Sequence, residues 1–460
     1  MGDKSSVILE DCLKRIEELG IKHVRFEFYD LNFVARSKTF PSRHFRKFVN
    51  SGIEYPALLF AFDTKGNLVK AVDFIKRTYF SNMVAYPDLS TFAVLPWVKD
   101  TARVFISAPT VDDGGVLTID PRSIALEQLK ALEKRGMSLL SSFELEFTLL
   151  NGKTGTRVDE EMNCCSTLRL ARHQEFFNMV SEHLYKAGVD IERVEAEGEK
   201  TVYELPTTPV FGIQSADMAS TVRTGLKEMA SQNGFTATFI AKPFEDSVVL
   251  AAHLNYSLWT LNGKTSLLND SSRPFGLSEM GEHWIAGILY HIPALSALLS
   301  PTVNCRHPRK SEEFNPSNAT WGIDNRTCAV RIKPRGPHGV YIEHRAISST
   351  SNPYIGIAAI IAAGLDGIDR KLPLPKPVPT NKHAADETSV PAETKSIPKD
   401  IESALQCLTE DEVLRDVFGP DFINAFKTIK LHEKETLLLH CNEKCNDAFK
   451  WVREFFMEYI

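Results

Sequence analysis

The sequence predicts an α+β protein in two parts, residues 1–110 and residues 111–460. The first part consists mainly of short segments in which apolar and polar residues alternate, which is the pattern of half-buried strands. The second part interleaves amphipathic helices with apolar strands, and no internal repeat stands out. With 460 residues, the chain is long enough to bury a large core in more than one domain.

Composition and charge exclude several classes of protein. The net charge of −6 offers no basic field for nucleic acid, and no apolar run reaches the length of a membrane span. The eight cysteines do not form two pairs at zinc-ligand spacing, which favours reduced thiols. We therefore expect a cytoplasmic protein that binds neither nucleic acid nor membrane.

In the first part, the pattern predicts an amphipathic helix over Ile8–Leu19, because Gly20 is a normal helix stop. Strand patterns follow at His23–Asp30, Phe33–Phe40, Leu89–Trp97 and Ala102–Ser107.

In the second part, Asp120-Pro121 is typical of a capped helix start, and Gly136 ends that helix after Arg135. Further helices are predicted at 171–187, 215–233, 284–299 and 352–368. Strands are predicted at 141–148, 235–243, 248–259 and 340–345. The proline-rich stretch 371–399 is expected to be an exposed loop, and 401–460 to be helical throughout.

Three of these strands carry polar residues two positions apart, and therefore on one face. They are Glu144 with Glu146, then His253 with Asn255 and Ser257, then Glu343 with Arg345. If the faces converge, their carboxylates and imidazole suit a hard divalent cation better than structural zinc. Each strand alone also fits a half-buried strand with a solvated polar face.

The order of several motifs resembles the glutamine synthetase superfamily over nearly the whole chain. The motifs are Phe143-Glu144-Leu145-Glu146-Phe147, Ala237-Thr238-Phe239 with Lys242-Pro243, His253-Leu254-Asn255-Tyr256-Ser257, Asn325-Arg326 with Val330-Arg331-Ile332, and Ile342-Glu343-His344-Arg345 followed by Asn352-Pro353-Tyr354. The resemblance implies an N-terminal β-grasp-like domain and a catalytic-type domain built on a curved antiparallel sheet with helices. It also implies a ring-stacked homo-oligomer, a dodecamer or decamer, with each active site between neighbouring subunits.

By the same resemblance, Glu144, His253 and Glu343 would hold the metal that serves the nucleotide phosphates, and Glu146 and Glu204 would belong to a second metal site. Contacts to phosphate or to the substrate carboxylate would come from Arg326, Arg331 and Arg345, and Ser257 would lie near the nucleotide. The implied cofactors are ATP and Mg²⁺ or Mn²⁺, in a phosphoryl transfer that joins an amine to a γ-carboxylate.

The positions that handle substrate depart from the superfamily. The Gly-Gln pair before Glu204 is lost, and the partner carboxylate of the second metal site falls on Ala196. Glu195 or Glu197 substitutes only if the backbone shifts by one residue, because neighbours in a strand face opposite ways. The glycine-rich substrate loop has become Val248–Ala251, with bulky side chains where backbone should approach the substrate.

Other catalytic positions depart as well. Phe314 stands in place of the flap glutamate, and Pro308 in place of the substrate-binding arginine. Tyr341 stands in place of the arginine before the last metal glutamate, and His338 in place of a nearby lysine. For the aspartate that deprotonates ammonium, Asp63 is the stand-in, and its sequence context also fits a turn. The expected metal ligands are thus retained, whereas residues expected to bind and convert the substrate are replaced.

Six segments are similar to the lengsin branch of the superfamily, which is regarded as non-enzymatic. They are Leu89–Trp97, Thr101–Val104, Gly212–Asp217, Val222–Glu228, Thr320–Gly322 and Ala362–Gly367. This implies an oligomeric structural or chaperone-like protein for lens intermediate-filament proteins, such as vimentin and beaded-filament proteins. The alternative is an active ATP-dependent glutamate-amine ligase, making glutamine or γ-glutamylamides, with an altered substrate pocket. Because loss of one preorganised charge-stabilising group costs about a hundredfold in rate, we favour the inactive form.

Overall fold

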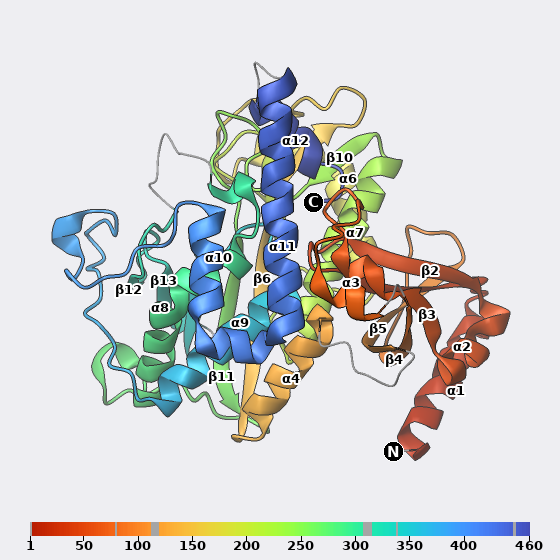
Figure 1. The fold of residues 1–460 in the computed structure, drawn as a ribbon, viewed down its shortest axis with the longest axis horizontal. Coiled ribbons are helices and arrows are strands. Elements are labelled where there is room, and N and C mark those ends of the chain that lie inside the picture. The colour runs from red at the N-terminus through yellow and green to blue at the C-terminus, as the bar shows by residue number, and fades with distance from the viewer. Residues whose placement is uncertain (1, 79–80, 112–118, 307–314, 337–338, 445–447) are drawn as a thin grey trace.

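A computed structural model describes residues 2–78, 81–111, 119–306, 315–336, 339–444 and 448–460 (Figure 1). These residues form two β-sheets, of five and nine strands, with helices packed against them. Every helix in the described ranges is too short or too polar to cross a lipid bilayer.

The smaller sheet has the strand order β2-β1-β5-β4-β3. Its strands are β1 (His23–Tyr29), β2 (Ala35–Pro41), β3 (Ile53–Pro56), β4 (Asn82–Val94) and β5 (Thr101–Val111), and the accompanying helices are α1 (Gly2–Glu18), α2 (Phe45–Ser51) and α3 (Asp73–Thr78). β1 runs parallel to β5, and the other neighbours are antiparallel. The predicted first helix and the four predicted strands are confirmed, although β4 begins earlier and ends before Leu95. The short β3, α2 and α3 were not predicted.

The larger sheet has the order β12-β13-β14-β11-β6-β8-β7, with β9 and β10 also paired to β6. The strands are β6 (Met137–Asn151), β7 (Glu195–Ala196), β8 (Val202–Pro206), β9 (Val210–Phe211), β10 (Phe235–Thr238), β11 (Ala252–Thr260), β12 (Trp321–Ile323), β13 (Val330–Gly336) and β14 (Gly339–His344). All pairs are antiparallel except β12 with β13. The predicted strands at 141–148 and 340–345 are confirmed, but β10 ends at Thr238 and β11 begins only at Ala252.

The remaining helices are α4 (Pro121–Glu133), α5 (Thr167–Ala171), α6 (Gln174–Lys186), α7 (Gln214–Gln232), α8 (Glu279–Leu299), α9 (Pro353–Asp369), α10 (Ile401–Glu410), α11 (Glu412–Lys444) and α12 (Ala448–Phe456). The carboxylate of Asp120 accepts the backbone N–H of Ser123 at 2.9 Å, which is the N-cap that the sequence predicted for α4. The prediction that 401–460 is helical is confirmed for the described residues of α10, α11 and α12, although Asp411 separates α10 from α11 and α11 is kinked at Gly419, whose φ of 76° is left-handed.

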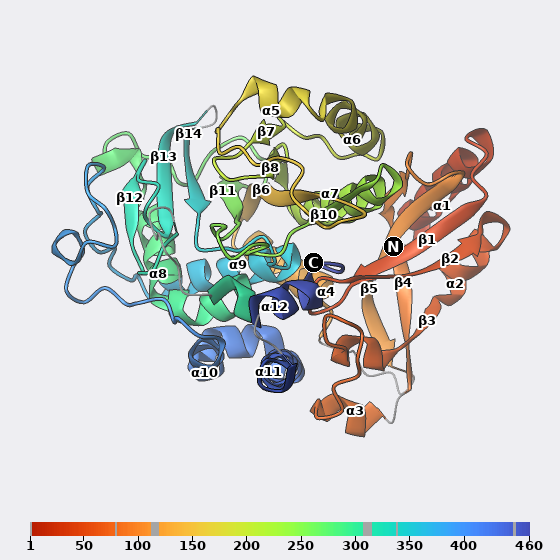
Figure 2. The same ribbon diagram turned by 90° about the horizontal axis from the view of Figure 1, so that it is seen from above.

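Helices α8 and α9 lie on one side of the larger sheet, and α10 and α11 lie beyond them (Figure 2). α8 and α9 approach so closely that a Cβ on Gly287 would come within 2.1 Å of the Ala363 carbonyl oxygen. A Cβ on Gly367 would meet the His283 carbonyl oxygen at 2.2 Å. Glycine at both positions therefore permits this helix pair, which supports the apolar face of the sheet from behind.

Candidate metal centre

The polar faces of the strands meet on one side of the larger sheet. Glu144 on β6 lies directly opposite His253 on β11, and Asn255 on β11 lies opposite Glu343 on β14. Glu343 in turn lies opposite Arg331 on β13. Because directly opposed residues of an antiparallel pair share a face, these side chains converge.

His253 stands between two carboxylates. Its Nδ1 lies 3.3 Å from Glu144 Oε2 and 3.6 Å from Glu343 Oε1. Glu144, Glu204 and His253 each offer a ligand atom, and these atoms lie within 4.8 Å of one another. Burial raises the pKa of Glu144, but the hydrogen bond and charge of His253 outweigh it, so the net pKa is lowered.

Glu343 is the most strongly paired carboxylate of the site and is 1% exposed. Arg345 Nη1 donates to Oε1 at 2.6 Å, Arg331 Nη1 donates to Oε2 at 2.9 Å, and Lys333 Nζ lies 3.3 Å from Oε2. Burial alone would raise the pKa of Glu343, yet the charges of His253, Arg345, Lys333 and Arg331 lower it to about 2. Both of its oxygens are therefore engaged by cations of the same chain.

A second acidic cluster lies one strand further along the sheet. Glu146 on β6 lies opposite Glu204 on β8, and Glu204 lies opposite Glu195 on β7. Oxygens of Glu195, Glu197 and Glu204 lie within 4.8 Å of one another. The structure thus decides the register that the sequence left open, because Ala196 pairs with Tyr203 and the two flanking glutamates share the face of Glu204.

The second cluster holds more negative charge than its neighbours offset. Burial, followed by the charges of Glu144 and Glu146, raises the pKa of Glu204 to about 10. Burial likewise raises the pKa of Glu146 to about 7. Arg193 offsets part of this charge, since its Nη2 donates to Glu204 at 2.7 Å and to Glu195 at 2.9 Å. Buried carboxylates with too few cations are the donor set that a hard divalent ion fits.

The segment in place of the substrate loop closes onto the acidic face. Ala251 donates its N–H to Glu146 Oε2 at 2.8 Å, and Val248 donates its N–H to Glu199 Oε2 at 3.2 Å. Leu250 is fully buried. The segment is therefore part of the packed structure, and its amides bond to carboxylates of this chain. The replaced positions Pro308, Phe314 and His338 lie outside the described residues.

The other predicted residues lie around this centre or apart from it. Ser257 accepts a hydrogen bond from Trp259 Nε1 at 2.9 Å, and the exposed Arg326 accepts one from Arg345 Nε at its carbonyl oxygen. Asp63 is fully buried in a turn, where it accepts the backbone N–H of Asn67 at 2.8 Å.

Sequence reasoning missed two cations of the centre, Lys333 and Arg193. Lys333 follows Arg331 by two residues, so strand alternation could have indicated it. Arg193 belongs to an irregular segment before β7, and no sequence signal marks it.

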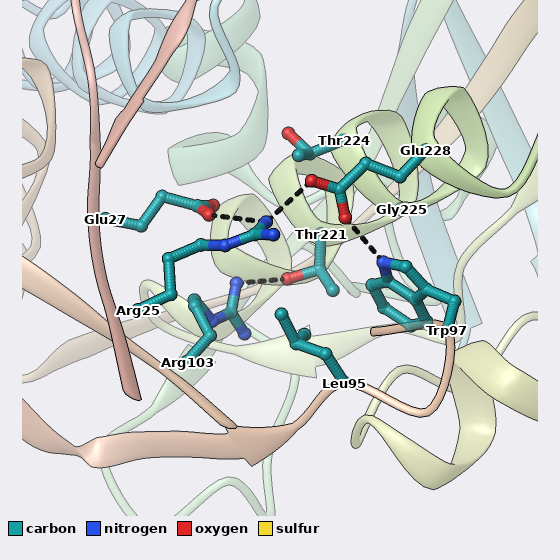
Figure 3. A pocket seen from close by; sticks show the side chains of 9 residues that line it. All are labelled: Arg25, Glu27, Leu95, Trp97, Arg103, Thr221, Thr224, Gly225 and Glu228. Atoms are coloured by element: carbon teal, nitrogen blue, oxygen red, sulfur yellow. Dashed lines mark hydrogen bonds and ion pairs between the residues drawn. The ribbon is translucent and has the colours of Figure 1, made fainter. Parts of the chain in front are cut away.

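A separate recess lies between the smaller sheet and α7 (Figure 3). Arg25 Nη1 donates to Glu228 Oε1 at 2.7 Å, and Trp97 Nε1 donates to Glu228 Oε2 at 2.6 Å. Arg103 Nη1 donates to Thr221 Oγ1 at 2.9 Å. These groups hydrogen-bond mainly to one another, so they connect α7 to the smaller sheet. The acidic strands of the larger sheet are therefore the better candidate for a functional site.

Comparison with known proteins places the chain among related sequences. Residues 118–445 match the family model described as glutamine synthetase, catalytic domain. The lengsin of Canis lupus familiaris is 36% identical over 98% of this chain and 77% of its own length. A glutamate–isopropylamine ligase of Pseudomonas sp is 27% identical over 91% of this chain and 92% of its own length. A solved structure described as a GmaS/ADP complex has a TM-score of 0.82 at 23% identity, covering 94% of this chain and 98% of that one.

Proposed function

The chain belongs to the glutamine synthetase family, and on that premise we propose that it is a cation- and nucleotide-binding, oligomeric structural protein without glutamine synthetase activity. It has the glutamine synthetase fold, whose enzymes are ATP-dependent ligases, so the question is which parts of that chemistry this chain retains.

The observation that carries the proposal is the ion network around Glu343. Arg331 and Arg345 are expected by resemblance to contact phosphate or substrate, yet each donates to Glu343. Arg331 also donates to Asp324 at 3.0 Å through Nε, and Arg345 donates to the Arg326 carbonyl oxygen. Guanidinium groups held in this way stabilise buried carboxylates, which is a structural role.

The acidic face supports retained cation binding. Glu144 and His253, with Glu204 or, by the resemblance, Glu343, would hold one Mg²⁺ or Mn²⁺ ion, and Glu146 and Glu204, with Glu195 or Glu197, would hold a second. When bound, such an ion neutralises phosphate oxygens of a nucleotide such as ATP. By the resemblance Ser257 would lie on the nucleotide side, whereas Arg331 is held by Glu343 and Asp324.

The resemblance to lengsins supports the rest of the proposal. The chain would assemble with itself into stacked rings of ten or twelve subunits in the cytoplasm. Its partners would be intermediate-filament proteins, such as vimentin and beaded-filament proteins. Co-sedimentation with assembled vimentin filaments, after electron microscopy has shown the rings, tests this part directly.

A second candidate is an active glutamate-amine ligase. It is favoured by one observation, namely that Glu195 and Glu197 supply carboxylates to the second cluster, although the resemblance places the partner carboxylate on Ala196. An altered pocket would then select the amine.

The deciding experiment measures ADP release with ATP, Mg²⁺ and glutamate, followed by ammonium, hydroxylamine, alkylamines or polyamines. Glu204→Gln is the matched control, because it preserves side-chain shape and removes a ligand of the second cluster. We expect equal release from both proteins, with the rings intact. Amine-dependent release that disappears in Glu204→Gln would refute the inactive form and establish the ligase.

A further inference from the structure

Two adjacent exposed cysteines, Cys164 and Cys165, lie beside β7, the strand that carries Glu195 of the second acidic cluster. Their Sγ atoms lie 3.6 Å apart. Neighbouring side chains of an extended backbone point in opposite directions, but Cys165 has a left-handed φ of 55°, which turns both thiols to the same side. A non-glycine residue adopts this conformation only when surrounding contacts hold it.

The contacts that hold this pair lead directly to β7. Cys165 donates its N–H to the carbonyl oxygen of Ala196 at 2.8 Å. The fully buried Arg169 donates through Nη1 to the carbonyl oxygens of both Asn163 and Glu197. The dithiol segment and the strand that carries the acidic side chains are therefore connected on both sides of the cysteine pair.

We propose that Cys164 and Cys165 are a redox-sensitive dithiol, which a hydroperoxide converts into a disulfide between adjacent residues, and that this weakens cation binding by the carboxylates of β7 and β8. One thiol sulfur attacks the peroxide and becomes a sulfenic acid, releasing water or an alcohol. The second sulfur then attacks the sulfenic sulfur and releases water. Two thiol hydrogens are lost, the sulfurs are oxidised, and the hydroperoxide is reduced. The effect on cations rests on the proposed function, whereas the oxidation does not.

Ring closure must move the backbone. The sulfur–sulfur distance has to fall from 3.6 Å to about 2.05 Å. Adjacent Cα atoms are also closer, at about 3.8 Å, than the Cα atoms of ordinary disulfides. The bond is therefore strained, which makes it easy to reduce and the modification reversible. Because the carbonyl oxygen of Ala196 accepts a hydrogen bond from the Cys165 N–H, movement of the Cys165 backbone also shifts Glu195 and Glu197 on either side of Ala196.

The oxidation is tested on the whole protein with hydrogen peroxide, at mildly alkaline pH because partial burial and the neighbouring thiol raise the pKa of Cys164 to about 11. Trypsin releases residues 158–169, which contain both cysteines and Met162. We expect this peptide to lose two hydrogen atoms, to resist alkylation, and to regain both thiols with dithiothreitol. Oxygen added at Met162 changes the mass in the opposite direction.

Phenylarsine oxide provides an independent probe, because a trivalent arsenical bridges two neighbouring thiols with loss of water. We expect one bridged adduct on the same peptide. Two separately alkylated cysteines after peroxide, sulfinic acids, or a disulfide between chains would each overturn the proposed dithiol.

The effect on cations is tested by titrating Mn²⁺ into the reduced and the oxidised protein. We expect Mn²⁺ binding to be about tenfold weaker after oxidation, as it is when residues that position metal ligands are changed. The double variant Cys164→Ser/Cys165→Ser should bind Mn²⁺ equally with and without peroxide. Equal affinity of the reduced and oxidised native chains would overturn the control of the cation site. Failure of the reduced protein to bind Mn²⁺ would overturn the proposed function. The masses of the tryptic peptide would still show whether Cys164 and Cys165 form a disulfide.

Discussion

Replacing Glu343 by glutamine tests whether the ion network of the centre is structural. The carboxylate is 1% exposed and is paired with two guanidinium groups and one ammonium group. Glu343→Gln keeps the size of the side chain but leaves Arg331, Arg345 and Lys333 without their shared counter-charge. Removing one partner from a buried ion network costs about 3–5 kcal/mol, so we expect the free energy of unfolding to fall by about that amount.

Glu144→Gln is the matched comparison on the same face. The Glu144 side chain is 15% exposed, and its ion-pair partners are His253 at 3.3 Å and Lys333 at 3.9 Å. Weaker pairing and partial exposure predict a loss of only about 1 kcal/mol. The two variants therefore change one charge each on neighbouring strands, with a severalfold difference in the expected effect.

The assay is urea unfolding in the presence of a chelator, followed by circular dichroism and tryptophan fluorescence. Midpoints from the same probe are compared, because a protein of this size need not unfold in one step. We expect the Glu343→Gln midpoint to lie clearly below that of Glu144→Gln. Equal midpoints would refute the structural reading of the arginines and would leave them available for phosphate.

Three further predictions concern other charged groups. Burial and neighbouring carboxylates raise the pKa of Glu204 from 4.5 to about 10, so the cation-free protein should lose stability as the pH rises through that interval. Glu204→Gln should remove both this pH dependence and the stabilisation by Mn²⁺, which thermal unfolding across pH would measure. Burial lowers the pKa of His291, but hydrogen bonds and charges from Asp411 and Asp366 outweigh burial and raise the pKa above 6.5. The contribution of His291 to the stability of the fold is therefore complete below pH 6.5 and is lost as the pH rises through the raised pKa. His291→Asn should flatten that dependence in urea unfolding, and an unchanged pH profile would contradict this. Glu228→Gln should lower stability by about 1 kcal/mol in the same assay, because it removes a half-buried ion pair, whereas no loss would show that the recess does not tie α7 to the smaller sheet.

The acidic face could be predicted because it depends on local geometry. Alternation along a strand places Glu144 with Glu146, and the same rule groups the polar residues of β11 and β14. Helix boundaries were predictable for a similar reason, since the Asp120 cap and a terminating glycine act within a few residues. Gly419-Pro420 was an equally local signal for the kink in α11, and the prediction of one continuous helical region overlooked it.

Features decided over long range could not be predicted. β7 has two residues, and its register depends on hydrogen bonds from Cys165 and Arg169, which lie about thirty residues earlier in the chain. β13 carries charged side chains that a sequence pattern assigns to the surface, yet Arg331 is 7% exposed because Glu343 pairs with it. Burial of such a charge follows from its partner, and the partner is known only once the strands are aligned.

Three hydrogen bonds join α11 to two loops that come early in the sequence. Glu433 on α11 accepts the backbone N–H of Thr64 at 2.9 Å and its hydroxyl at 2.6 Å, and the buried Lys430 donates to Asn32. These partners are separated by 369 and 398 residues. During synthesis, the loops after β1 and before α3 must wait for α11 to leave the ribosome before their buried polar groups are satisfied. We therefore expect the smaller sheet of a nascent chain to be incompletely protected, and so exposed to aggregation, until α11 has been made.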